Sequence, residues 1–133
     1  MRFALSESLA LTGKRLLVVE DEYLIANDLA ATLCDAGAEV IGPAASLQNA
    51  FQLLAGGATC DAAVLDINLR GQEVFPLAAE IRQRQVPILF LTGYGASSIP
   101  EEFANEARCE KPTDIANVVN RLASLLGPMT EAA

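Results

Sequence analysis

The sequence of 133 residues contains no histidine and no tryptophan. Without histidine, the chain can neither carry a phosphoryl group on an imidazole nor use one as acid, base or metal ligand. Its three cysteines, Cys34, Cys60 and Cys109, form no C-x-x-C pair and leave one thiol unpaired in any disulfide scheme. Reduced thiols in a cytoplasmic protein are therefore expected. Any phosphoryl chemistry must use another side chain.

Long apolar runs and basic residues are also scarce. No apolar run approaches the ~20 residues that a membrane span requires, and Ser6, Glu7 and Ser8 interrupt any signal-peptide pattern. There are 9 Lys and Arg residues against 17 Asp and Glu residues, a net charge of -8. A surface of this charge repels nucleic-acid phosphates. We therefore expect a cytoplasmic protein that binds neither membranes nor nucleic acid.

Apolar runs of strand length alternate with segments of helical period along the chain. Strands are expected at 15–20, 38–41, 62–67, 86–92 and 107–110, each followed by a helix, the fourth of them short and near 100–104. Five successive βα units predict a doubly wound α/β fold, with a five-stranded parallel sheet covered on both faces.

One domain is expected over residues 14–127, between an N-terminal extension (1–13) and a C-terminal tail (128–133). The tail is too short to hold a DNA-binding or catalytic output domain, which predicts that the domain stands alone. In the extension, four apolar side chains either pack onto the domain or belong to a frayed segment: Phe3, Leu5, Leu9 and Leu11.

Local signals set the bounds of two elements in more detail. Gly42-Pro43 is expected to end the second strand. Ser46 is expected to cap the following helix, with Phe51 on the inner face of that helix.

Polar side chains stand at the carboxyl ends of four of the expected strands. The first strand ends at Glu20 and Asp21, the third carries Asp66, the fourth ends at Thr92 and the fifth leads to Lys111. Ligands of open α/β sheets bind outside these strand ends. Each residue also has an ordinary structural use, such as a helix cap for Asp21 or a turn for Asp66. Their joint placement is what favours a functional site.

The chemistry of these residue types explains why they would gather. Carboxylates in one crevice repel each other, which implies a hard cation, and Mg²⁺ suits a site that combines few carboxylates with phosphate and water. A carboxylate can itself be the nucleophile and form an aspartyl-phosphate. A metal and a lysine suffice to neutralise and position the transferred group, and a nearby hydroxyl can report its presence.

These residues resemble the response-regulator receiver domains, the CheY-like family, over roughly residues 14 to 126. The resemblance implies strand order 2-1-3-4-5, with Asp66 as phosphoacceptor, Lys111 as the family's lysine and Thr92 as its switch hydroxyl. It also implies a set of Mg²⁺ ligands: Asp21, Asp66, the backbone carbonyl of Asn68, and Glu20 through water.

The same resemblance implies partners. The phosphoryl donor would be a sensor histidine kinase or a histidine phosphotransfer protein, and the signal would pass to a downstream protein. The chain would catalyse only its own phosphorylation and dephosphorylation and would not otherwise be an enzyme.

The segment L-F-L-T-G-Y-G also resembles the motif F-A-T-G-x-Y of single-domain receivers from alphaproteobacteria, although Leu91 replaces its alanine and Tyr94 follows Gly93 directly. Typical receivers carry an aromatic switch residue three positions before the lysine, where this sequence has Arg108. We therefore expect the signal to leave through the segment after Thr92 (93–104), with Tyr94 responding and Arg108 exposed as a contact residue.

Other functions stay open. The domain would also suit a phosphate sink that drains a shared kinase, and the missing aromatic residue motivates an unphosphorylated interaction module. A phosphatase of the haloacid dehalogenase type needs a second acid where the sequence has Asn68. A flavodoxin-like FMN binder needs a phosphate loop where Glu20, Asp21 and Glu22 would repel the phosphate.

Overall fold

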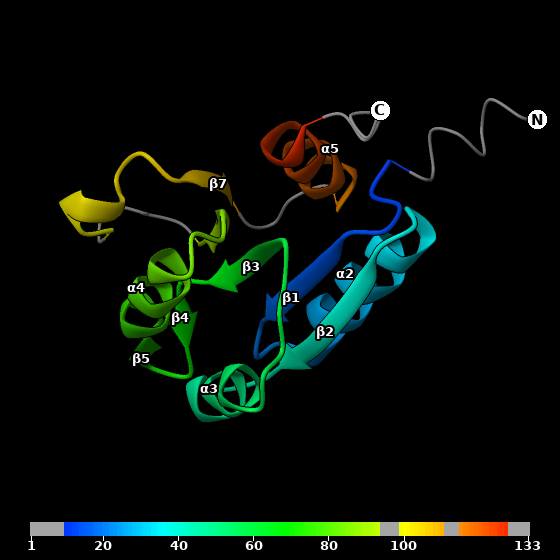
Figure 1. Ribbon diagram of the computed structural model, residues 1–133. Helices are drawn as coiled ribbons and strands as arrows, with labels where there is room; N and C mark the ends of the chain where they lie inside the picture. The colour runs from blue at the N-terminus through cyan, green and yellow to red at the C-terminus, as the bar shows by residue number, and fades with distance from the viewer. Residues whose placement is uncertain (1–9, 94–98, 111–114, 128–133) are drawn as a thin grey trace, which may run out of the picture.

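A parallel five-stranded sheet forms the centre of the computed structural model in Figure 1, which describes residues 10–93, 99–110 and 115–127. The strands of this sheet are β1 (Arg15–Val19), β2 (Glu39–Ala44), β3 (Ala62–Asp66), β6 (Ile88–Thr92) and β7 (Ala107–Glu110). Their order is β2-β1-β3-β6-β7, and every neighbouring pair is parallel. Counted along the chain, these five strands have the predicted order 2-1-3-4-5.

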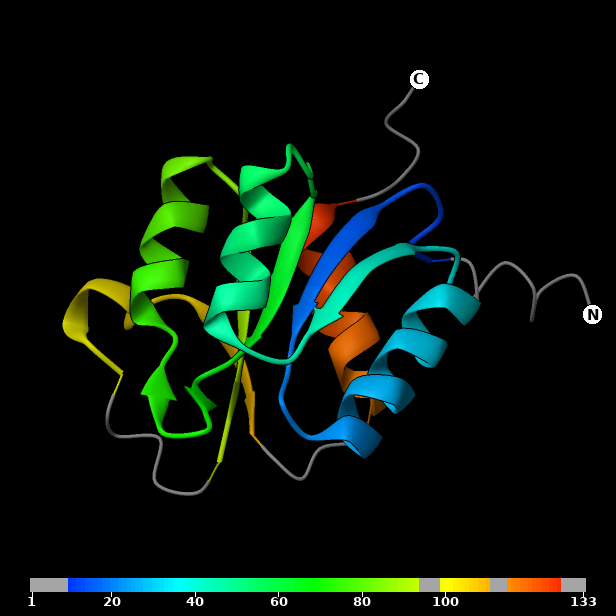
Figure 2. The same cartoon turned by 90° about the horizontal axis from the view of Figure 1, so that it is seen from below.

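In the part of the chain that the structure describes, two helices pack on each face of the sheet, and Figures 1 and 2 show the two pairs on opposite sides of it. One face carries α2 (Tyr23–Asp35) and α5 (Ile115–Leu126), and the other carries α3 (Leu47–Ala55) and α4 (Phe75–Gln83). The predicted doubly wound α/β architecture is therefore confirmed. Among the described residues, no helix has both the length and the apolar character needed to cross a membrane.

The sheet separates two layers of core because successive side chains of a strand point to opposite faces. In β3, Ala63 and Leu65 pack towards α3 and α4, whereas Ala62 and Val64 pack towards α2 and α5. β3 and β6 are buried along their whole length, as central parallel strands covered on both faces should be. The residues at their carboxyl ends are therefore held by strands that are packed on both faces.

The aromatic side chains are distributed unequally between the two layers. Three phenylalanines, Phe75, Phe90 and Phe103, contact one another in the layer beneath α3 and α4, with ring centroids 5.6–5.9 Å apart. Over the described residues, the layer beneath α2 and α5 is formed by aliphatic side chains, alanines and Cys109.

The prediction that the second strand ends at Gly42-Pro43 is wrong, because β2 continues to Ala44. The register with β1 shifts between Leu17 and Val19, and pairing resumes at Ala44. Gly42 has a φ of +100°, and a Cβ there would lie 2.7 Å from the backbone nitrogen of Ala44. Only glycine fits this backbone, which lets the strand bend past Pro43 and pair again.

The helix α3 follows its predicted start and, apart from Phe51, its predicted inner face. The Ser46 side chain accepts a hydrogen bond from the Asn49 backbone N–H at 3.1 Å, which confirms the cap. Phe51, however, is 37% exposed. The buried positions of this short helix are Ala50 and Leu54, and Phe51 lies about 100° around the axis from Ala50. The buried stripe is therefore narrower than the apolar pattern suggested.

Two segments outside the strands and the four helices also pack onto the core: the stretch before β7 and the stretch before β1. The fourth expected helix is a single 3-10 turn, η2 (Glu101–Phe103), whose Phe103 is buried. Before β1, the side chain of Leu11 is buried, and its backbone N–H donates to the carbonyl of Ala36 at 2.8 Å. Of the four apolar residues in the extension, Leu11 thus packs onto the domain, and the other three lie outside the described residues.

Candidate metal and phosphoryl site

Three carboxylates meet at the carboxyl edge of the sheet. Glu20 and Asp21 follow β1, and Asp66 ends the neighbouring strand β3, because Val19 pairs with Leu65. One carboxylate oxygen of each acid lies within 4.8 Å of the other two. Glu20 is 1% exposed and Asp66 is 5% exposed. The structure thus brings together the three acids that the sequence grouped.

The chemistry of this donor set fits Mg²⁺. Clustered buried carboxylates destabilise one another unless a positive charge offsets them, and carboxylate oxygens are the ligands that hard cations prefer. Two oxygens bound to one Mg²⁺ at about 2.1 Å lie at most about 4.2 Å apart. The oxygens of Glu20, Asp21 and Asp66 are already within 4.8 Å of one another, so small side-chain movements would let them share one ion.

Backbone groups next in the chain orient two of the acids. Glu20 Oε2 accepts a hydrogen bond from the backbone N–H of Glu22 at 3.0 Å. Asp66 Oδ1 accepts one from the backbone N–H of Asn68 at 3.2 Å. Each carboxylate is thereby held at the strand end by the loop that follows it, which restricts its rotamers in advance of any ligand.

A small hairpin beside Asp66 is the part of the site that the sequence analysis missed. It consists of β4 (Asn68–Leu69) and β5 (Gln72–Glu73), which pair antiparallel. The two turn residues, Arg70 and Gly71, have φ values of 52° and 86°, as the type I′ turn of a two-residue hairpin requires. Asn68 Oδ1 closes the turn by accepting a hydrogen bond from the Gly71 backbone N–H at 2.8 Å.

The hairpin places a cation next to the acids. Arg70 Nε lies 3.8 Å from Asp21 Oδ2, with the Arg70 side chain 72% exposed and that of Asp21 15% exposed. Two-residue strands are too short to show an alternating pattern, and the turn lacks the usual Asn-Gly or Asp-Gly pair. The available signal was Gly71, which follows Asp66 by five residues.

Thr92 also lies at this edge. It is the last residue of β6, its side chain is buried, and the residue before it, Leu91, pairs with Asp66 on β3. The predicted switch hydroxyl and the predicted phosphoacceptor are therefore at the ends of adjacent strands. Lys111 and Tyr94 lie outside the described residues, and the role of the Asn68 carbonyl as a ligand stays a prediction.

Arg108 lies away from the acids, on the edge strand β7. It is half-buried, and its guanidinium donates to the backbone carbonyl of Ala104 at 2.6 Å. Together with Asn117 and Arg121 of α5, it lines a surface hollow of about 310 Å³ whose other lining residues are Cys109 and Glu110. The expectation of an exposed side chain is thus met only in part.

The chain is similar to known proteins in both sequence and structure. Residues 16–122 match the family profile described as the response regulator receiver domain. The transcriptional regulatory protein PdtaR of Mycobacterium tuberculosis is 30% identical over 114 residues, which cover 83% of this chain and 55% of PdtaR. The chain thus spans about half the length of this curated relative.

Two solved structures share the fold over most of their length. A response regulator receiver protein from Sinorhizobium medicae WSM419 has a TM-score of 0.73 at 27% identity, covering 85% of this chain and 94% of its own. SdrG from Sphingomonas melonis Fr1 has a TM-score of 0.66 at 33% identity, covering 89% and 98% respectively.

Proposed function

The chain belongs to the response regulator receiver domain family, and we propose that it accepts a phosphoryl group on Asp66 and signals through protein–protein contact. The donor would be a sensor histidine kinase or a histidine phosphotransfer protein. One observation carries the proposal: Asp66 ends a fully buried central strand and lies within 4.8 Å of two other carboxylates.

In the proposed reaction, a carboxylate oxygen of Asp66 forms a bond to phosphorus while the bond from phosphorus to the donor imidazole nitrogen breaks. The imidazole keeps the electron pair and takes up a proton. The hydrogen bond from the Asn68 backbone N–H to Asp66 Oδ1 fixes the orientation of the nucleophile, which lowers the entropic cost of the reaction.

Glu20, Asp21, Asp66 and the Asn68 carbonyl would hold Mg²⁺, which supplies charge neutralisation to phosphoryl transfer when it is bound. Lys111 would add a second positive charge. Thr92, at the end of the strand next to Asp66, would donate a hydrogen bond from its hydroxyl to the new phosphoryl oxygens and so sense them.

The signal would leave through residues 93–104, with Tyr94 as the responding side chain, and reach a partner at Arg108. The hollow around Arg108 supports an acidic partner surface, because two arginines line it against a single acid, Glu110. Arg108 and Arg121 line it together, and among the described residues neither forms an ion pair, whereas the other four described arginines do.

Two rival functions are less well supported. An unphosphorylated interaction module would keep three close carboxylates at a cost in stability without using them. A phosphatase of the haloacid dehalogenase type needs a second acid at Asn68. We therefore propose that the chain is not an enzyme beyond its own phosphorylation and dephosphorylation. We also propose that it works in the cytoplasm.

A phosphate sink is a third possibility within the proposed function. Measured phosphoryl flow from the protein back to the kinase would identify it.

The test is incubation with acetyl phosphate and Mg²⁺ followed by intact mass measurement. We expect a gain of one phosphoryl group that is lost when EDTA is added beforehand. A wild-type protein that gains no mass, from acetyl phosphate or from a phosphorylated kinase, would overturn the proposal. We also propose that the protein is a single-domain receiver that resembles the F-A-T-G-x-Y subgroup, and the mass of the protein isolated from its own cells would test the single-domain part.

A further inference from the structure

We propose that Arg70 is a built-in counter-cation of the acidic site and competes with the divalent cation for Asp21, so that Arg70 sets the Mg²⁺ concentration at which the domain becomes competent for phosphorylation. This role rests on the proposed function, because it concerns the same metal site. Arg70 is then a positioning residue and not a ligand of the ion.

The charge arrangement is the first support. Arg70 Nε lies 3.8 Å from Asp21 Oδ2, and Asp21 shares its site with Glu20 and Asp66. Among the basic residues that the structure describes, Arg70 alone forms an ion pair with one of these acids. A guanidinium at this place offsets part of the repulsion among the carboxylates, and it repels a divalent cation that enters the same cluster.

The backbone under Arg70 is the second support. Its φ of 52° is left-handed, a conformation that is uncommon for side chains other than glycine, asparagine and aspartate. Type I′ turns normally have Asn, Asp or Gly at this first position. An arginine therefore stands where other residues would fit with less strain, and such strain is found preferentially at functional sites.

The hairpin ties this arginine mechanically to the phosphoacceptor. Asn68 accepts a hydrogen bond from the Gly71 backbone N–H through Oδ1 at 2.8 Å, and its own backbone N–H donates to Asp66 Oδ1 at 3.2 Å. One residue thus connects the turn that carries Arg70 with the carboxylate of Asp66. The backbone that carries the guanidinium to the side of Asp21 is therefore held by hydrogen bonds to the Asp66 loop.

The size of the effect follows from exposure. The Arg70 side chain is 72% exposed, so the guanidinium can move into solvent when a cation takes Asp21. Exposed ion pairs are weak and screened by salt, and losing one changes an equilibrium by about two- to fivefold. Arg70 should therefore tune the Mg²⁺ affinity and not abolish binding.

The test is calorimetric titration of the full chain with MgCl2 at low ionic strength. Arg70→Asn removes the charge and favours the left-handed turn, and Arg70→Ala checks that asparagine itself adds no ligand. Both variants should bind Mg²⁺ with a dissociation constant about two- to fivefold lower than the wild type. Arg70→Lys should stay close to the wild type, and the difference should shrink in 0.5 M salt, a condition of roughly 4 Å screening length.

Arg84→Ala is the matched control, because Arg84 pairs with Glu80 on α4 at 3.0 Å and its loss changes the net charge equally. An unchanged or weaker Mg²⁺ affinity in both Arg70→Asn and Arg70→Ala, with normal binding by the wild type, would overturn the role of Arg70 alone. An equal gain in Arg84→Ala would also overturn it, since the effect would then come from net charge. Absence of Mg²⁺ binding by the wild type would overturn the proposed metal site as well.

Discussion

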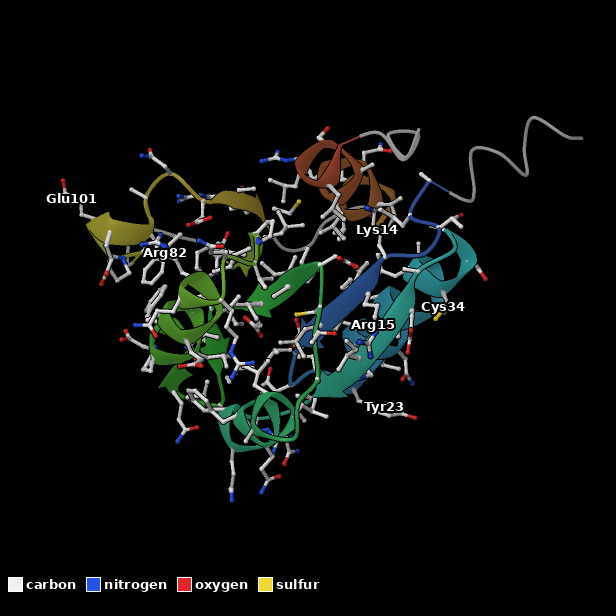
Figure 3. The ribbon with its side chains drawn as sticks, viewed as in Figure 1. Lys14, Arg15, Tyr23, Cys34, Arg82 and Glu101 are labelled. Atoms are coloured by element: carbon white, nitrogen blue, oxygen red, sulfur yellow. The ribbon has the colours of Figure 1, made fainter. Side chains whose placement is uncertain are left out.

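The guanidinium of Arg82 lies over the ring of Phe103, with Cζ 4.3 Å from the ring centroid. The same guanidinium donates to the backbone carbonyl of Glu102 at 2.8 Å and pairs with the Glu106 carboxylate at 2.7 Å. Figure 3 shows Arg82 on the side of α4 that faces η2. The last turn of α4 thus anchors part of the segment that was expected to respond to phosphorylation as a whole.

Replacing this anchor should cost stability. Arg82→Ala removes a cation–π contact and a partly exposed ion pair, which together stabilise the fold by roughly 1–2 kcal/mol. We expect the midpoint of urea unfolding to fall while the m-value stays unchanged. Arg84→Ala, which removes a single exposed i,i+4 pair, is the control and should cost less than about 0.5 kcal/mol. Equal losses in the two variants would show that the Phe103 contact contributes nothing.

Because Arg82 holds residues 101–106, we expect phosphorylation to affect them less than the residues just after Thr92. Addition of beryllofluoride, which mimics the phosphoryl group, together with Mg²⁺ should shift backbone amide resonances most in the metal loops and from Gly93 to Ile99. Residues 101–106 should shift less, because Arg82 and the buried ring of Phe103 hold them. A dominant shift at Arg108, with Tyr94 unaffected, would contradict this route.

The phosphoacceptor assignment has a direct test in Asp66→Asn. The amide preserves the shape of the side chain and can still accept the hydrogen bond from the Asn68 N–H, so the fold should persist while mass gain from a phosphorylated kinase disappears. Asp28→Asn, on the exposed side of α2, should be phosphorylated normally. Full labelling of Asp66→Asn would place the phosphoryl group elsewhere.

Mg²⁺ should stabilise the wild type against heat. A ligand that binds only the folded state contributes about 2.7 kcal/mol at 100 times its dissociation constant. Asp21→Asn should lose most of this gain, and without Mg²⁺ it should be at least as stable as the wild type, because it relieves repulsion with Glu20 and Asp66. A scanning-calorimetry trace of the wild type that does not respond to Mg²⁺ would rule out the metal site.

Cys34 and Cys60 should differ in their reactivity towards iodoacetamide. Cys34 is exposed on α2, as Figure 3 shows, whereas burial and then the charge of Asp61 raise the pKa of the Cys60 thiol. Only the thiolate reacts, so a raised pKa means that alkylation of Cys60 keeps accelerating as the pH rises above 9.0, the ordinary value. Peptide mapping should find Cys34 modified well before Cys60 at pH 8, and equal rates would contradict this order.

The order of elements could be predicted because central strands are continuous apolar runs that end at polar residues. The pairing of β1 with β3 then accounts for the meeting of Glu20, Asp21 and Asp66. The predicted end of the second strand was wrong for a local reason. The extension of β2 past Pro43 depends on a left-handed glycine and on renewed pairing with β1, and neither the φ of a residue nor its partner strand is visible in an apolar pattern.

The ion pair between Arg70 and Asp21 could not have been predicted for a different reason. It joins a hairpin of two-residue strands to the end of β1, and so it depends on tertiary geometry that no local periodicity encodes. Phe51 was correctly predicted to lie in a helix, but its burial was not. The width of the buried stripe is set by the neighbouring elements and not by the helix itself.

The confinement of Phe75, Phe90 and Phe103 to one side of the sheet gives the two core layers different magnetic environments. Aromatic ring currents displace the resonances of protons held above or beside a ring, so methyl groups beneath α3 and α4, such as those of Leu77 and Ile81, should spread to unusual frequencies. Those of Val18 and Leu33, in the layer beneath α2 and α5, should stay near their ordinary positions. A methyl spectrum would therefore follow the loosening of each layer separately, in a chain that has no tryptophan to serve as a fluorescent reporter.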